Sequence, residues 1–266
     1  MIIQLNNRTL LKLTGDDVQS FLQGQFSNNI DGLEEGTVQL NAYCQHQGKI
    51  IALLWVMKRD DDFYLSFPND LSEIITKRLT MFKMMSAVDI KDMSDEIIQL
   101  GVVDESFDGG FKINDQQSVA FVKSLDGVEL DDASEWEAVC IDNDIPEVTL
   151  ATSEKFVPQL LNLDINEVGV NFTKGCYPGQ EVVARLHYLG KSKRRMRQFE
   201  CEGEVNIGDE LVVAGSKSAK ASGVVVRRVK LGAKSSFLAT VEVAYEDDKI
   251  TLNDADGIEL TRVVHG

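Results

Sequence analysis

The stretch Lys174-Gly175-Cys176-Tyr177-Pro178-Gly179-Gln180-Glu181 packs two glycines, a proline and a cysteine into eight residues. Glycine permits backbone angles that a side chain forbids, and proline fixes its own φ and removes an N–H. The stretch therefore predicts a tight, exposed turn that carries reactive groups. The residues that follow, Glu181 to Leu186, suit a short helix. That helix would place the turn at an N-terminus, where free N–H groups and the helix dipole favour anions.

Cys176 is the candidate functional thiol of this turn. The thiolate is the reactive form of cysteine, and helix N-termini and nearby cations promote its formation. Lys174 lies two residues away, and Arg185 falls one turn into the expected helix. The alternative is an inert cysteine that packs as a small hydrophobe. A pairing of Cys176 with His187 rests only on their closeness in sequence, whereas such dyads are defined by geometry.

The octapeptide resembles the K-G-C-Y-x-G-Q-E signature of the YgfZ-like folate-binding family, relatives of the glycine-cleavage T protein. Every fixed position matches, and the flanking segments 157–164 and 181–185 are also similar to that family. The resemblance implies a tetrahydrofolate-binding protein that assists iron–sulfur enzymes, including those that thiolate tRNA. It makes Cys176 and Lys174 the candidates for the chemistry. The candidates from the motif for cofactor binding are Tyr177, Gly179, Gln180, Glu181 and Arg185.

A second candidate segment, residues 136–146, resembles the family pattern W-x-x-x-x-I-E-A-G-x-P. Trp136 matches the family's folate-contacting tryptophan, whose indole would cover a planar pterin. Asp142 stands where the family has a glutamate that reads the donor edge of the pterin. Trp136 equally suits the core side of an amphipathic helix, since buried aromatics are common. Arg8 lies roughly where some members carry a second tryptophan.

A turn near the first strands bears on the choice between an accessory protein and an enzyme. Asn41 to Ile50 resembles the family's A-x-C-D-x-x-G-K turn, with Gln45 in place of the aspartate. In the T protein the comparable turn leads into a catalytic aspartate pair, and those places fall here at about Ala52 and Leu53. Amine transfer to tetrahydrofolate needs a positioned proton acceptor or charge partner.

The leading hypothesis is therefore an accessory protein without transferase activity. It would use Cys176 and bound tetrahydrofolate, or a one-carbon derivative of it, in iron–sulfur cluster assembly or repair. Its expected partners are iron–sulfur enzymes such as radical enzymes that thiolate tRNA. The alternative is a tetrahydrofolate-dependent aminomethyl or one-carbon transferase.

Composition limits the class of protein. The 266 residues predict one large or two modest domains, and a hydrophobic content of 43% suffices for real cores. The net charge of −16 argues against broad nucleic-acid binding, which needs a positive surface, and so disfavours direct tRNA binding.

Cysteine usage and hydropathy predict a cytoplasmic protein without a metal site or a membrane span. None of the four cysteines forms a C-x-x-C pair, and three histidines give no zinc or iron–sulfur spacing. The longest apolar run, Ile50 to Met57, has eight residues, whereas a membrane-spanning helix needs about 20. The first residues lack the apolar core of a signal peptide.

Hydrophobic patterns predict an α+β region over residues 1–190. The run from Ile50 to Met57 is typical of a strand buried on both faces, and Phe63 to Phe67 alternates as its hairpin partner. Apolar spacing predicts a helix over 71–82, with Leu71, Ile74, Ile75, Leu79 and Phe82 on one face. Thr14-Gly15-Asp16-Asp17 resembles a capping box before a short helix.

The remaining patterns complete the expected architecture. Strands are predicted at 97–103 and 118–123 with a loop over 104–117, and a helix is predicted around Trp136. The region 96–130 is shorter than the resemblance to the family implies, which leaves open whether 104–117 lacks a helix or hairpin of the family. Residues 191–266 show period-2 alternation and predict a small antiparallel β-barrel. The resemblance implies the same fold: a T-protein-like folate-binding region with mixed or antiparallel sheets and helices, read as one region or two interleaved subdomains, followed by the barrel.

The run Lys191-Ser192-Lys193-Arg194-Arg195-Met196-Arg197 has five cations in seven residues. It is suited to the glutamate tail of a folate, a phosphate backbone or an acidic partner protein. A solvated linker between the two regions explains it equally well, since charged runs are usually exposed.

Overall fold

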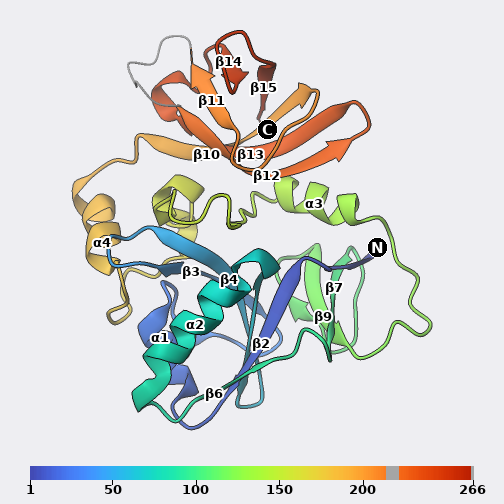
Figure 1. The fold of residues 1–266 in the computed structure, drawn as a ribbon, viewed down its shortest axis with the longest axis vertical. Coiled ribbons are helices and arrows are strands. Elements are labelled where there is room, and N and C mark those ends of the chain that lie inside the picture. The colour runs from blue at the N-terminus through green and yellow to red at the C-terminus, as the bar shows by residue number, and fades with distance from the viewer. Residues whose placement is uncertain (214–221, 265–266) are drawn as a thin grey trace.

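The computed structural model describes residues 1–213 and 222–264, which form two sheets, a barrel and the helices around them (Figure 1). Part of the predicted barrel region, residues 214–221 and 265–266, lies outside the described residues. The strand ladders are antiparallel. The prediction of an α+β fold with a small C-terminal antiparallel barrel is confirmed.

The first sheet has the order β3-β4-β5-β2-β6. Its strands are β2 (Arg8–Thr14), β3 (Val38–Cys44), β4 (Ile50–Arg59), β5 (Asp62–Pro68) and β6 (Asp89–Asp92). Two helices pack on it, α1 (Val18–Gln25) and α2 (Ser72–Phe82). The predicted central strand is confirmed, because every residue of β4 from Ile50 to Met57 is buried. Its side chains pack into three apolar clusters on both faces of the sheet, which explains why the run contains no polar residue.

The second sheet has the order β1-β7-β9-β8 and lies beside the first (Figure 1). Its strands are β1 (Ile2–Gln4), β7 (Ile98–Val103), β8 (Phe111–Lys112) and β9 (Gln117–Val122). The loop predicted over 104–117 therefore contains a two-residue strand, which pairs with β9. The helix α3 (Ala133–Asp142) follows, and the side chain of its N-cap residue Asp132 accepts a hydrogen bond from the Ser134 N–H.

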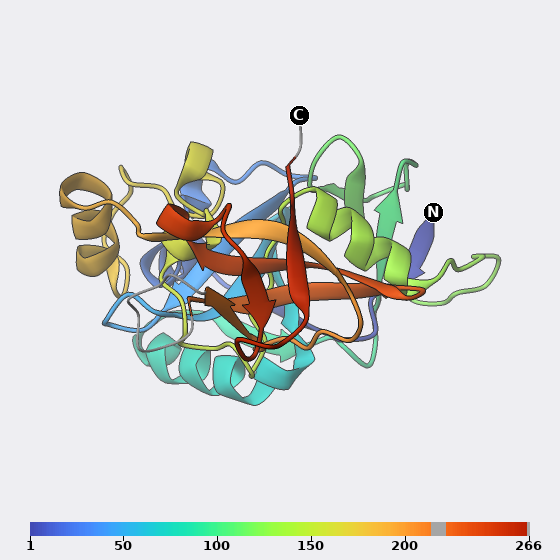
Figure 2. The ribbon, with the colours of Figure 1, turned by 90° about the horizontal axis from the view of Figure 1, so that it is seen from above.

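The barrel closes in the order β10-β13-β12-β11-β14-β15. Its strands are β10 (Arg194–Glu202), β11 (Glu210–Val213), β12 (Gly223–Leu231), β13 (Lys234–Glu242), β14 (Ile250–Leu252) and β15 (Glu259–Val263). Figure 2 looks onto the barrel and shows α3 on one side and α4 (Gln180–Leu189) on the other. Between those helices the chain makes two 3-10 turns, η4 (Pro158–Leu161) and η5 (Ile165–Glu167).

Two local predictions are wrong. The expected capping box does not form, because α1 begins at Val18 and Asp17 is its N-cap residue. The Asp17 carboxylate instead accepts a hydrogen bond from the Ala87 N–H at 2.7 Å. On α2, Ile75 and Leu79 are buried as expected, but Ile74 and Phe82 are 38% and 44% exposed.

None of the helices that the structure describes is long and apolar enough to span a membrane.

Candidate functional site

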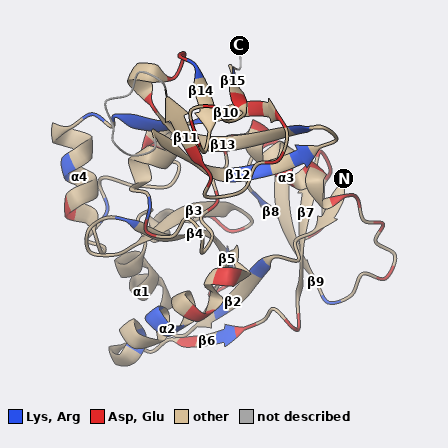
Figure 3. Cartoon of the chain, turned by 45° about the horizontal axis from the view of Figure 1, so that its top comes forward, with Lys and Arg blue, Asp and Glu red and all other residues tan. Residues whose placement is uncertain are grey.

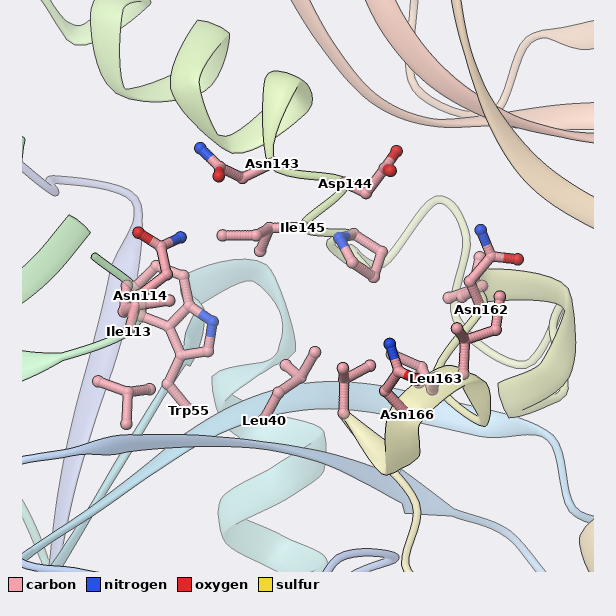
Figure 4. Close-up of a pocket in the computed structure, with 15 residues that line it drawn as sticks. Leu40, Trp55, Ile113, Asn114, Asn143, Asp144, Ile145, Asn162, Leu163 and Asn166 are labelled. Carbon is pink, nitrogen blue, oxygen red and sulfur yellow. The ribbon is translucent and has the colours of Figure 1, made fainter. Parts of the chain in front are cut away.

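A cavity of about 410 Å³ lies where the first sheet, the end of α3 and the 3-10 segment meet beneath the barrel (Figure 4). Its size is within the usual range of small-molecule sites. Apolar side chains such as Leu40, Ile145 and Leu163 form much of the wall, and amide side chains interrupt it. The cavity is therefore suited to a largely apolar, planar molecule with a few polar atoms.

Trp55 on β4 is the aromatic residue of this wall, although only 4% of its surface is exposed. Its indole nitrogen points into the cavity (Figure 4). The Arg8 guanidinium lies over the indole ring, 3.7 Å from the centroid. Trp136 meets Trp55 edge to face, with centroids 6.0 Å apart and planes at 74°. The indole is thus held by two neighbours while its N–H stays directed at the cavity.

Arg8 is itself held by buried partners. Its Nη1 donates to Glu147 Oε1 at 2.5 Å, its Nε to Ser66 Oγ at 2.8 Å, and its Nη2 to the Ser66 carbonyl at 2.9 Å. Burial lowers the pKa of Arg8, while the Glu147 carboxylate acts in the opposite direction. Glu147 follows Pro146 in the cavity wall, so this ion pair joins β2 to the wall.

A second buried arginine fixes the same wall segment from the barrel. Arg227 on β12 is ion-paired with Glu137 on α3, with Nε 2.7 Å from Oε2. Its Nη1 donates to the Ile145 carbonyl at 3.1 Å. The segment between α3 and the 3-10 turns is therefore clamped by one arginine from each structural region.

Three residues of the wall adopt left-handed backbone angles without being glycine: Asp144 at φ +53°, Asn162 at +59° and Asn166 at +51°. Such strain gathers at functional sites. Asn162 donates from Nδ2 to the Met196 carbonyl at 3.0 Å, while its buried Oδ1 has no protein partner among the described residues. The Asn166 amide points into the cavity (Figure 4).

The predicted pair Trp136 and Asp142 lies close to the cavity but does not line it. Trp136 is 2% exposed and packs behind Trp55 on Gly101, where a Cβ would come within 2.4 Å of the indole. Asp142 ends α3 on the surface and accepts a hydrogen bond from Gln198 at 3.1 Å. A contact of either residue with a ligand stays a prediction.

The motif turn packs against the hairpin turn between β3 and β4. Gly179 has φ +84°, and a Cβ there would lie 2.5 Å from the Gln45 carbonyl oxygen and 2.7 Å from the Gly48 Cα. Gly48 also has a positive φ, +78°. Only glycine at Gly179 allows so close an approach, so the two segments that resemble the family form one unit.

Cys176 is exposed on this turn, whereas the other three cysteines are buried. Burial raises the pKa of Cys44 to about 12 and that of Cys140 to about 11. Tyr177 next to Cys176 points inward and is buried. The turn therefore presents one thiol to the solvent on a rigid backbone.

Lys174 uses its ammonium group as a structural tether. Its Nζ donates to the carbonyls of Gln23, Phe26 and Asn28 at 2.6–2.7 Å, where α1 ends. Burial lowers the pKa of Lys174 to about 8. Its charge thus balances the negative end of the α1 dipole, and its stabilisation of a Cys176 thiolate stays a prediction.

The other motif candidates lie at the start of α4. The Gln180 N–H donates to the Tyr177 carbonyl at 3.2 Å. Glu181 and Arg185 are exposed and form an ion pair with each other at 2.6 Å, one turn apart. The His187 ring stacks on Phe172 with centroids 3.7 Å apart.

The structure thus separates the candidates into a cavity group and a motif group, joined through η4. Gln159 donates from Nε2 to the Val183 carbonyl of α4 at 2.8 Å, while Leu161 of the same turn lines the cavity. Sequence reasoning missed Trp55, Asn162 and Asn166. Trp55 was hidden inside a continuous apolar run, and no sequence signal separates a cavity-lining residue there from a core residue.

The arginines of the basic run are engaged in ion pairs. Arg195 binds Asp164, and Arg194 and Arg197 bind glutamates of the barrel region, Glu242 and Glu246. Basic and acidic segments accordingly lie interleaved around the barrel (Figure 3). Lys191 and Lys193 are exposed. No group of three or more metal-ligating side chains is arranged for a metal ion in the part of the chain that the structure describes.

Comparison with known proteins finds relatives along most of the chain, although no family model matches it. An uncharacterized protein of Haemophilus influenzae is 30% identical over 238 residues, covering 86% of this chain and 84% of that protein. The tRNA-modifying protein YgfZ of Photobacterium profundum is 28% identical over 225 residues, 73% of this chain and 68% of its own length. That of Colwellia psychrerythraea is 28% identical over 229 residues, 73% of this chain and 70% of its own length.

Among solved structures, the glycine cleavage system aminomethyltransferase T of Bartonella henselae has a similar fold. The TM-score is 0.71 at 12% identity, covering 99% of this chain and 84% of that one. The expected T-protein-like fold is therefore confirmed.

Proposed function

The chain belongs to the YgfZ-like family and has the fold of the glycine-cleavage T protein, and from this premise we propose that it is a tetrahydrofolate-binding accessory protein for tRNA modification. Relatives along most of its length carry the name tRNA-modifying protein YgfZ. We place its action at iron–sulfur cluster assembly or repair, on which thiolation of tRNA by radical enzymes depends.

The cavity is the observation that carries the folate part of this proposal. Its volume of about 410 Å³ and its apolar walls suit a planar bicyclic ring. The Asn162 amide points away from this space toward the barrel, where its Nδ2 donates to the Met196 carbonyl (Figure 4). Trp55 and Asn166 direct polar atoms into the same space (Figure 4). The residues present therefore fit the ring system of a pterin.

A transferase reaction is the less supported alternative. Ala52 and Leu53, at the places of the T-protein aspartate pair, are apolar and buried in β4. Asp144 is the one carboxylate among the described residues of the cavity wall. Removing a proton from an amine donor needs a positioned base, and the strand that should supply it offers none.

We propose that Cys176 is the functional thiol that acts on the partner iron–sulfur enzyme. It is exposed, and the turn that carries it is locked against the β3–β4 hairpin. An exposed thiol on a rigid turn is accessible to a second protein, which a buried thiol is not. The proposed partners are iron–sulfur enzymes, and the net charge of −16 disfavours tRNA itself.

The cellular test measures thiolated nucleosides in tRNA from a strain that lacks this protein. Wild type and Cys201→Ala should both restore them, whereas Cys176→Ala should leave them at the level of the deletion strain. Soluble amounts of each variant are compared in the same cells. If Cys176→Ala fully restored the thiolated nucleosides, the Cys176 thiol would have no part in the proposed function.

A further inference from the structure

We propose that Trp55 recognises the ligand of the cavity by a hydrogen bond. Its indole N–H would donate to an acceptor on the edge of a planar heteroaromatic ring. The Arg8–Glu147 pair is the positioning element that keeps the indole in place. This inference rests on the proposed function and names the donor that selects the ring.

The unused N–H is the first observation. Only 4% of the surface of Trp55 is exposed, and its indole nitrogen points into the cavity (Figure 4). Within the part of the chain that the structure describes, no acceptor from the protein takes this N–H. The nitrogen is not among the buried polar atoms that lack a partner in the described residues, so it is accessible from the cavity and open to a ligand atom. An acceptor atom of the ligand completes the site.

The fixed orientation of the ring is the second observation. Arg8 lies over one face of the indole at 3.7 Å, and Trp136 touches it edge to face. Arg8 cannot move away easily, because it is bonded to Ser66 and to the buried Glu147. A donor held in this way loses little freedom when it binds, so its hydrogen bond contributes nearly fully to affinity.

Trp136 has a different part. It lies behind Trp55 on Gly101 and does not reach the cavity wall. It therefore supports the rotamer of Trp55 through packing, and its own N–H is not offered to the ligand space. The two tryptophans are the only ones in the sequence, which makes each of them observable by itself.

The chemistry of the cavity defines the ligand class. Leu40, Ile145 and Leu163 offer apolar surface to the faces of a ring. The Trp55 N–H requires an acceptor, such as a ring nitrogen or carbonyl oxygen, on the edge that faces β4. A reduced pterin has both features, whereas a purely hydrocarbon ring lacks the acceptor.

The experiment uses two single-tryptophan variants of the full chain, Trp136→Phe and Trp55→Phe, titrated with tetrahydrofolate. Trp136→Phe keeps an aromatic ring behind Trp55, and saturation with the ligand should change the emission of Trp55 strongly. Trp55→Phe keeps an aromatic ring but loses the donor, so calorimetry should show binding about tenfold weaker, the scale of one hydrogen bond. The emission of Trp136 in that variant should hardly respond.

The positioning role has its own readout. Arg8→Lys keeps a cation near Glu147 but removes the planar stack, so ligand-free Trp55 in the Trp136→Phe background should gain local mobility, seen as lower fluorescence anisotropy. Restoring arginine should restore the anisotropy. Unchanged anisotropy would overturn the positioning role.

The outcomes separate the two claims. Equal affinity of wild type and Trp55→Phe, or a silent Trp55 in Trp136→Phe at saturation, overturns this inference and leaves the proposed function standing. Absence of saturable binding by wild type overturns the proposed function, and this inference with it.

Discussion

Gly179 and Gly48 meet backbone to backbone, so closely that a Cβ on Gly179 would lie 2.7 Å from the Gly48 Cα. The contact joins the turn that carries Cys176 to the hairpin between β3 and β4. Since β4 also carries Trp55, the thiol turn and the cavity wall are built on the same strand pair.

Replacing Gly179 with alanine should destabilise the protein strongly. The residue has φ +84°, and the new Cβ would collide with the Gln45 carbonyl. Backbone strain alone costs about 1–3 kcal/mol, and the collision adds to it. Gly175→Ala is the matched control, because no atom lies within 4 Å of its Cβ position. Urea unfolding measures both, and equal stability of the two variants would contradict the contact.

Breaking the Arg8–Glu147 pair should also be costly. Arg8→Met leaves the Glu147 carboxylate buried without its cation, which typically costs about 3–5 kcal/mol. The double variant Arg8→Met with Glu147→Leu should recover part of this loss, because no unpaired charge remains.

The exposed pair of Arg185 and Glu181 supplies the control for that experiment. Arg185→Ala should barely change the free energy of unfolding, since surface ion pairs contribute little. A similar loss in Arg185→Ala and Arg8→Met would show that burial is not what makes the Arg8 pair important.

Lys174 should make stability depend on pH in alkaline solution. Burial lowers its pKa in the folded protein to about 8 from the ordinary value of 10.5. Between these two values the unfolded chain binds more protons, so the free energy of unfolding of wild type should rise with pH relative to Lys174→Met. Below pH 8 the difference between the two proteins should be constant.

Urea unfolding from pH 7 to pH 10 tests this, with Lys193→Met as an exposed lysine control. A difference that falls with pH would mean that the three carbonyl contacts of the ammonium outweigh its burial.

The cysteines should differ sharply in reactivity. At pH 8, iodoacetamide should modify Cys176 in the native protein, while Cys44 and Cys140 stay protected by burial and by their raised pKa values. After unfolding in urea all four should react. Mass spectrometry of peptides assigns the sites, and early labelling of Cys44 would show that the hairpin opens.

Local patterns in the sequence were sufficient to predict much of the fold. The apolar run of β4, the alternation of the barrel strands and the helix near Trp136 follow from residues close together in the chain. The capping box failed because Asp17 is used by a distant partner, Ala87. Tertiary contacts of this kind have no local signal.

The candidate site was predictable only in part. The motif marked an exposed cysteine, and the structure places Cys176 on the surface. The target of the Lys174 ammonium was not predictable, because α1 lies far away in the sequence. Trp55 was read as core, since burial on both faces and a place beside a cavity give the same apolar run. The period-2 alternation of residues 191–266 predicts barrel strands but carries no information on the pairing of Arg227 with Glu137.

The central claim is that tetrahydrofolate binds in the cavity without being used in one-carbon transfer. Calorimetric titration of Val168→Trp tests it most directly, because Val168 lines the cavity and is half exposed, so a larger side chain should fill the space without disturbing the core. Ile74→Trp, on α2 away from the cavity wall, is the control. We predict saturable one-to-one binding by wild type and Ile74→Trp, its loss in Val168→Trp, and no one-carbon transfer from an aminomethyl donor in the same solutions. Undiminished binding by Val168→Trp, or turnover by wild type, would contradict the account.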